Sequence, residues 1–173
     1  MSARAGGIGS LGLALWVLVV AGCGYAPLTA ESLSPDLRSI HVAPVKNETF
    51  RPGLEGAVTA ALLREFRSDG RVQLASQDAS QSDLGGRITA YESLPISFTP
   101  FDVGRRYRVR IWLAFALRAR GKEQALLEEQ VAGEAYYLTG TDVVSTRTAE
   151  EEAAQRAIRD LATRVVARIL DGL

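Results

Sequence analysis

The chain has 173 residues, with 20 Lys and Arg against 20 Asp and Glu, one Cys and one His. This balanced charge argues against a nucleic-acid binder, which normally carries a basic excess. The single Cys excludes an intramolecular disulfide, and together with the single His it removes most zinc sites and most His-based catalytic sites. No metal or cofactor is therefore expected, and the composition favours a non-enzymatic protein with one globular domain.

Residues 1–22 are typical of a secretory signal peptide. The uncharged apolar run over residues 11–21 is too short for a membrane-spanning helix, which needs about 20 apolar residues. The run ends at Val20-Ala-Gly-Cys23, which resembles the lipobox of bacterial lipoproteins. Cys23 is therefore predicted to become an acylated N-terminus that holds the protein at a membrane. The alternative is a secreted protein in which this Cys is incidental.

Gly24 follows the Cys where Asp signals inner-membrane retention in enteric lipoproteins, so this resemblance favours the outer membrane. Residues 23–38 are predicted to form a lipidated tether, and residues 39–173 a single domain. A G-x-G-x-x-G motif at residues 7–12 matches the dinucleotide-binding fingerprint. It lies in the leader and follows no strand, so we reject a nucleotide site there.

The mature chain begins with a short strand and a helix. Residues 39–45 alternate apolar and polar side chains and predict a strand that Pro44 ends or places at an edge. From Pro52 the apolar spacing becomes helical, which predicts a helix over about residues 53–68 with Gly70 as its C-terminal cap.

Three further strands are expected. The first covers about residues 84–98, where Gly85, Gly86 and Pro95 indicate a bend or bulge, and its apolar face is expected to hold Leu84, Ile88, Ala90, Leu94 and Ile96. Strict alternation over residues 106–118 predicts a strand with one buried face. A turn at residues 121–124 then leads to a partner strand that contains Leu127, Val131, Ala135 and Tyr137.

A closing helix carries an apolar stripe at Ala154, Ile158, Leu161, Val165 and Ile169. Thr148-Ala-Glu-Glu151 fits a capping box at its start, and the acidic residues 150–152 complement the helix dipole there. The order strand, helix, three strands, helix predicts an α+β fold. We expect a four-stranded, mainly antiparallel sheet with two helices packed on one face.

Two arrangements that resemble catalytic or metal sites have simpler explanations. Glu150, Glu151 and Glu152 are successive helical residues that face different directions, so helix capping explains them better than a metal site. His41 is the only histidine, and no strained nucleophile motif such as G-x-S-x-G accompanies it. We therefore expect a surface histidine and no catalytic residues.

The outward face of the strand over residues 106–118 is the one positive feature. Arg106, Arg108 and Arg110 recur at every second position, in one row with Trp112 and next to Arg105. Such a row could hold a phosphorylated head group through paired guanidinium donors. The alternative is a solvated face that Glu128 and Glu134 of the partner strand partly neutralise, and the sequence does not separate the two.

Several segments together resemble the LptE family of lipopolysaccharide (LPS) assembly lipoproteins. The matching segments are Cys23-Gly-Tyr25, Ile40 to Asn47 with Thr49, Pro52 to Glu55 followed by Thr59, Gly86 to Tyr91, Tyr107 to Leu117, and Ala153 to Leu170. The resemblance implies a non-enzymatic outer-membrane lipoprotein that plugs the LPS-translocon β-barrel, LptD, and helps to deliver LPS to the outer leaflet.

The resemblance also implies that basic residues near strand ends meet the phosphates of lipid A. Arg105, Arg106, Arg108 and Arg110 are the candidates by their character, because the family motif does not fix their positions. The second hypothesis is another outer-membrane assembly lipoprotein, such as an activator of a peptidoglycan synthase.

Overall fold

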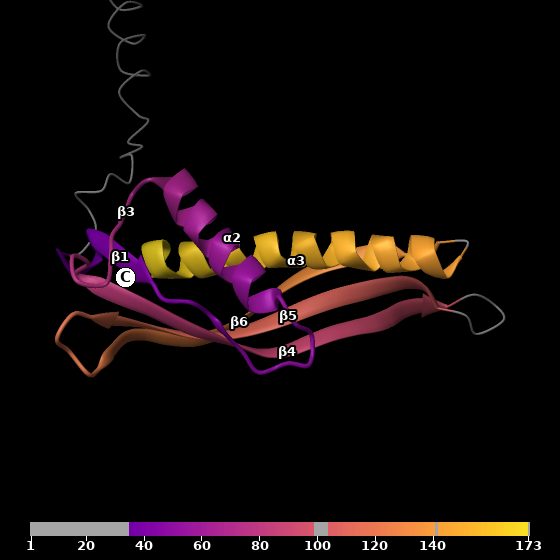
Figure 1. Cartoon of the computed structure of the whole chain (residues 1–173), viewed down its shortest axis with the longest axis horizontal. Helices are drawn as coiled ribbons and strands as arrows, with labels where there is room; N and C mark the ends of the chain where they lie inside the picture. The colour runs from indigo at the N-terminus through magenta and orange to yellow at the C-terminus, as the bar shows by residue number, and fades with distance from the viewer. Residues whose placement is uncertain (1–34, 99–103, 141, 173) are drawn as a thin grey trace, which may run out of the picture.

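The computed structural model describes residues 35–98, 104–140 and 142–172, so the predicted signal peptide and Cys23 lie outside the described residues. A 3-10 turn, Pro35–Leu37, precedes the strands and helices (Figure 1). These are β1 (Ser39–Val42), β2 (Lys46–Asn47), α2 (Leu54–Asp69), β3 (Gln73–Leu74), β4 (Ser82–Phe98), β5 (Gly104–Ala119), β6 (Ala125–Leu138) and α3 (Val143–Asp171). None of the helices in these ranges has the length and hydropathy of a membrane span.

All six strands form one mixed sheet in the order β3-β1-β4-β5-β6, with β2 also paired to β4. β4, β5 and β6 are antiparallel, whereas β1 and β2 run parallel to β4 and β3 runs parallel to β1. The α+β class is confirmed, but the prediction of four mainly antiparallel strands is wrong because it omits β2, β3 and the parallel pairs. β2 and β3 contain 2 residues each, too few for an alternating pattern.

A bulge reverses the two faces of β4 midway along the strand. Leu84 and Ile88 are buried, as predicted. The register with β5 then shifts between Ile88 and Ala90, and beyond this point Leu94 is 50% exposed and Ile96 is 43% exposed. The prediction that Ala90, Leu94 and Ile96 share the buried face with Ile88 is wrong. The inserted residue turns Ala90 and Leu94 to the other face, and Ile96 lies at a second register shift between Pro95 and Ser97.

Helix α2 lies close to its predicted position. It begins after Gly53, which has φ +86°, and it ends at Gly70, which has φ +75°. Only glycine adopts these left-handed conformations without strain. The N–H of Gly70 donates to the carbonyl of Phe66 in the last turn of α2, so this carbonyl has a hydrogen-bond partner. Gly70 is therefore the C-terminal cap, as predicted.

Helix α3 begins earlier than its predicted cap. The Asp142 carboxylate accepts a hydrogen bond from the Ser145 N–H at 2.9 Å, and the Asp142 N–H donates to the Ser145 hydroxyl at 3.3 Å. This pair closes a capping box, so the predicted box at Thr148 is wrong. The Thr148 hydroxyl instead donates to the Val144 carbonyl within the helix. Asp142 with Ser145 three positions later differs from the S/T-x-x-E/Q pattern of a capping box, so the sequence pattern does not reveal this helix start.

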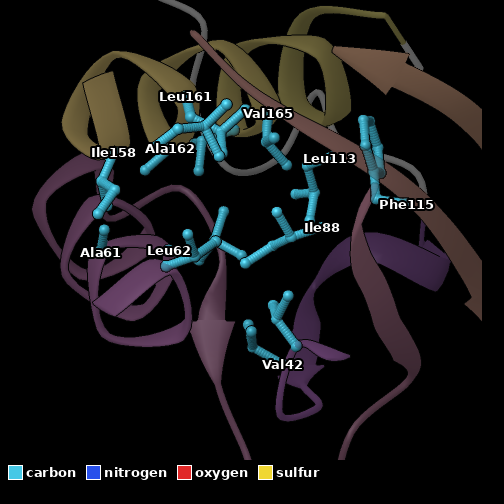
Figure 2. Packing of buried hydrophobic residues seen from close by; sticks show 14 of the residues in the cluster. Val42, Ala61, Leu62, Ile88, Leu113, Phe115, Ile158, Leu161, Ala162 and Val165 are labelled. Atoms are coloured by element: carbon cyan, nitrogen blue, oxygen red, sulfur yellow. The ribbon is translucent and has the colours of Figure 1, made fainter. Parts of the chain in front are cut away.

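Both helices lie on one face of the sheet, as predicted (Figure 1). Figure 2 shows Leu62 of α2, Leu161 of α3 and the sheet residues Ile88 and Leu113 directed into the space between these layers, and each is at most 1% exposed. Leu37 is fully buried in the same core, although the segment that contains it was expected to be a tether. The packed domain therefore begins before Ser39.

Candidate ligand-binding face

Strand β5 separates an apolar face from an arginine-bearing face. Val109, Ile111 and Leu113 are fully buried in the core beneath the helices. The alternate residues belong to the opposite face of the sheet, where Arg106, Arg108 and Arg110 are at least partly exposed. The three arginines therefore share the sheet face that no helix covers.

The surroundings of the arginines differ. Arg110 donates to the Glu134 carboxylate at 3.2 Å, and its guanidinium carbon lies 5.5 Å from the centre of the Trp112 ring. The hydrogen bond from Arg110 holds the pKa of Glu134 below its ordinary value. Arg110 is thus already neutralised, as the solvated-face alternative expects. Arg105 belongs to β5, but its side chain lies outside the described residues.

Arg106 and Arg108 lie among exposed apolar side chains. Arg106 is stacked on the Tyr136 ring at 5.0 Å, and Arg108 lies between Leu94 of β4 and Tyr136 of β6 in the sheet register. Leu138 pairs with Arg106 and is 61% exposed. No ion pair involves either arginine in the part of the chain that the structure describes. We call these five residues the arginine end: Leu94, Arg106, Arg108, Tyr136 and Leu138.

A cavity of about 450 Å³ adjoins the arginine end, between the end of β6 and helix α3. Its lining includes Arg106 and Leu138 from the sheet and Ala149 and Arg156 from the helix. The arginine end thus combines guanidinium donors with apolar surface. The sequence shows the arginines but hides their apolar neighbours, because the β4 bulge brings Leu94 to this face.

The prediction that Glu150 and Glu151 lie at the start of α3 and help to cap it is wrong, because the helix begins at Val143. Both side chains instead bind an arginine that is distant in sequence. Arg51 donates to Glu150 at 3.0 Å across 99 positions, and it also bonds Glu151. The Tyr91 hydroxyl donates to the same Glu150 carboxylate at 2.8 Å, and Arg51 lies 4.3 Å from the centre of the Tyr91 ring. Burial and the hydrogen bond to Glu150 raise the pKa of Tyr91. Local sequence spacing carries no signal for such a contact.

The remaining polar candidates are the single histidine and the clustered acidic side chains. His41 pairs through Nδ1 with the Asp83 carboxylate, and no serine hydroxyl of the described chain bonds its ring. No cluster of at least three His, Cys, Asp or Glu side chains within the described ranges is arranged to hold a metal ion.

Comparison with known proteins identifies a family and several structures with a similar fold. The sequence matches the family model described as LptE, lipopolysaccharide-assembly, over residues 37–169. None of the curated proteins compared with the chain matches it.

Solved structures share the architecture at low sequence identity. Rare lipoprotein B from Shewanella oneidensis is 15% identical with a TM-score of 0.56, over 76% of this chain and 95% of that chain. A minor lipoprotein from Acinetobacter baumannii is 15% identical with a TM-score of 0.55, over 79% of this chain and 94% of that chain. A protein from Xanthomonas campestris is 14% identical with a TM-score of 0.57, over 77% of this chain and 84% of that chain. These likenesses show the fold alone, whereas the family model covers most of the chain. The chain therefore belongs to the LptE family of lipopolysaccharide-assembly proteins.

Proposed function

We propose that this protein is an outer-membrane lipoprotein that plugs and supports the LPS-translocon β-barrel LptD. In this role it is anchored by acyl chains on Cys23, and it assists LPS delivery to the outer leaflet without catalysing a reaction. The observation that carries the proposal is the arginine end of the sheet, in a chain that belongs to the LPS-assembly family.

The chemistry of the arginine end suits a lipid with an anionic head group. Neither Arg106 nor Arg108 has an ion pair or a side-chain hydrogen bond to a carboxylate among the described residues, although the charge of Arg108 also helps to lower the pKa of Glu134. Their donors are therefore available to phosphate oxygens. Leu94 and Leu138 beside them offer apolar surface to acyl chains. Arg110 contributes less in this proposal, because Glu134 already holds it.

The open face of the sheet also suits a barrel lumen. Polar and charged side chains along this face match the polar interior of large outer-membrane barrels. Docking in the barrel and binding of LPS would then use neighbouring parts of one surface. Each role needs its own measurement.

The first prediction concerns LPS binding. We expect Arg106 and Arg108, replaced together by Ser, to weaken LPS binding about tenfold or more, because two charge-assisted hydrogen-bonding groups are lost. The salt dependence of binding should also become flatter. Binding is measured with the mature full-length protein in detergent over a salt series, after mass spectrometry confirms an acylated N-terminus.

The double variant Arg67→Ser/Arg118→Ser is the matched control, because it removes the same two charges at exposed positions that lie away from the arginine end. It should bind LPS like the wild type. An equal loss of LPS binding in both variants would mean that only net charge matters. Unchanged binding in both would mean that the arginines of β5 form an ordinary solvated face. Co-purification of LptD with the wild type tests the plug, and recovery of a peptidoglycan synthase instead would favour the second hypothesis.

A further inference from the structure

Strand β4 has an open edge beyond Ile88. The last backbone bond on that side runs from the Glu48 N–H to the Ile88 carbonyl at 3.0 Å, where β2 ends. In the described part of the chain, no strand pairs with this side of residues 90–94. Pro95, which has no N–H, then limits the edge. Alternate residues between 90 and 94 thus direct unpaired backbone donors and acceptors to the open side, which another strand can use.

A cleft of about 760 Å³ runs beside this edge. Ala90 and Tyr91 of β4 line it, together with residues 48–52 and with Arg147, Glu150 and Glu151 of α3. Phe50 belongs to this lining, yet its side chain is 108% exposed. We call this hollow the β4 cleft.

The loop that carries Phe50 is fixed on both sides of that residue. The Asn47 amide donates to the Arg51 carbonyl at 2.8 Å and accepts from the Thr49 N–H at 3.0 Å. The Arg51 side chain is bonded in turn to Glu150 of α3. An aromatic side chain displayed on a fixed loop loses little conformational freedom on binding, which favours its use as a binding anchor.

We propose that the β4 cleft binds an extended segment of another polypeptide, which adds as a strand to residues 90–94 and packs an apolar side chain against Phe50. Strand addition uses the open backbone groups for affinity and the neighbouring side chains for specificity. We take this polypeptide to be the barrel. Only this identity rests on the proposed function, whereas strand addition itself rests on the open edge of β4.

The charges of the cleft favour a polypeptide over an anionic ligand. Three carboxylates and two guanidinium groups line it, and Arg51 is already bonded to two of the carboxylates. No single sign of charge is concentrated there to attract a phosphate or an anionic membrane surface. The other features of the cleft are unpaired backbone groups and an exposed aromatic ring. An extended peptide can form hydrogen bonds with the backbone groups and pack an apolar side chain against the ring.

A second copy of this chain fits less well. Two β4 edges paired antiparallel over residues 90–94 would place Glu92 opposite its own copy. Like charges directly opposite each other destabilise a strand pair. Self-pairing is therefore an outcome of the test that would overturn the proposal.

The test uses the acylated full-length protein. A photoreactive amino acid in place of Phe50 should cross-link to the barrel polypeptide in membranes. In the purified complex, hydrogen exchange of those amides of residues 90–94 that point away from β5 should slow about tenfold or more relative to the free chain. Phe50→Ser should reduce both the protection and the barrel recovery at least about fivefold, because the aromatic anchor is lost. Val144→Ser, at a 75% exposed residue outside the cleft lining, should change neither.

The outcomes separate this inference from the proposed function. Barrel co-purification with unprotected residues 90–94 overturns strand addition and leaves the plug function standing. If LptD does not co-purify but Phe50 cross-links to another polypeptide with the same amide protection, the plug function fails and strand addition stands. Cross-links only to a second copy, or none at all, overturn the inference.

Discussion

Arg110 and its neighbours Arg106 and Arg108 follow one alternating pattern, but their contacts differ. Strict alternation is enough to predict that the three share a face. It does not predict which of them is neutralised, because that depends on the register with β6. Of the two glutamates expected to neutralise the row, Glu134 lies opposite Arg110 and binds it, whereas Glu128 lies opposite Ala116.

Tyr91 gives a prediction at the scale of one residue. Tyr91→Phe removes the hydroxyl that donates to Glu150, and Glu150 keeps Arg51 as a partner. We expect a loss of about 1 kcal/mol in the free energy of unfolding, the usual value for one hydrogen bond. Urea unfolding at neutral pH measures it.

The same substitution should change the response to alkaline pH. Burial, then the bond to Glu150, raises the pKa of Tyr91 in the folded state, so folding favours the neutral phenol. The resulting stability is complete below the ordinary tyrosine value of 10.0 and is lost as pH rises above it. Tyr91→Phe should therefore lose less stability between about pH 9 and about pH 11 than the wild type. Parallel curves for the two proteins would contradict this assignment.

At the scale of elements, the sequence predicts the long strands and the buried stripes of both helices, because each has a clear period. Its errors fall where a tertiary contact replaces a local signal. The β4 bulge and the two-residue strands β2 and β3 leave no periodic trace. The loop around Phe50 is another case, since its local Asn47 hydrogen bonds are joined by an ion pair from Arg51 to Glu150, 99 positions away.

The contact between β6 and α3 allows a sharp test at Gly133. A Cβ atom at this position would lie 2.2 Å from the Ala157 carbonyl oxygen and 2.5 Å from the Leu161 Cβ. Both atoms belong to the helix and cannot move without displacing it. Gly133→Ala should therefore destabilise the fold by about 3 kcal/mol, at the upper end of the usual cost of overpacking.

Gly85→Ala is the control for Gly133, because a Cβ atom at Gly85 of β4 meets no atom within 4 Å. Its stability should stay within about 0.5 kcal/mol of the wild type in denaturant unfolding. If the two alanine variants unfolded at the same denaturant concentration, α3 would not lie as close to β6 as the structure has it.

At the scale of the molecule, the core lies between the sheet and the helices, whereas the two proposed binding surfaces lie on the uncovered face and along one edge of the sheet. The core between the sheet and the helices contains residues from Leu37 to Leu170. The arginine end lies on the uncovered face, and the β4 cleft lies along one edge of the sheet. Substitutions at the arginine end and at the exposed Phe50 should therefore change binding with little effect on folding, whereas substitutions in the helix stripe should do the reverse.

Ile158 tests this division. It lies on the predicted stripe of α3, it is 1% exposed, and Figure 2 shows it above Ala61 of α2. Because the core formed by the described residues runs from Leu37 to Leu170, a fragment of residues 35–173 should fold without the N-terminal segment and its lipid. In that fragment Ile158→Asp should lower the free energy of unfolding by more than about 3 kcal/mol, since an unpaired carboxylate replaces a buried apolar side chain. Gln155→Asp, at an exposed position of the same helix, should change it by less than about 0.5 kcal/mol. Thermal and urea unfolding of the two variants decide the matter: equal stability would mean that α3 does not turn this stripe towards the sheet, and an unfolded parent fragment would mean that the domain needs residues before Pro35.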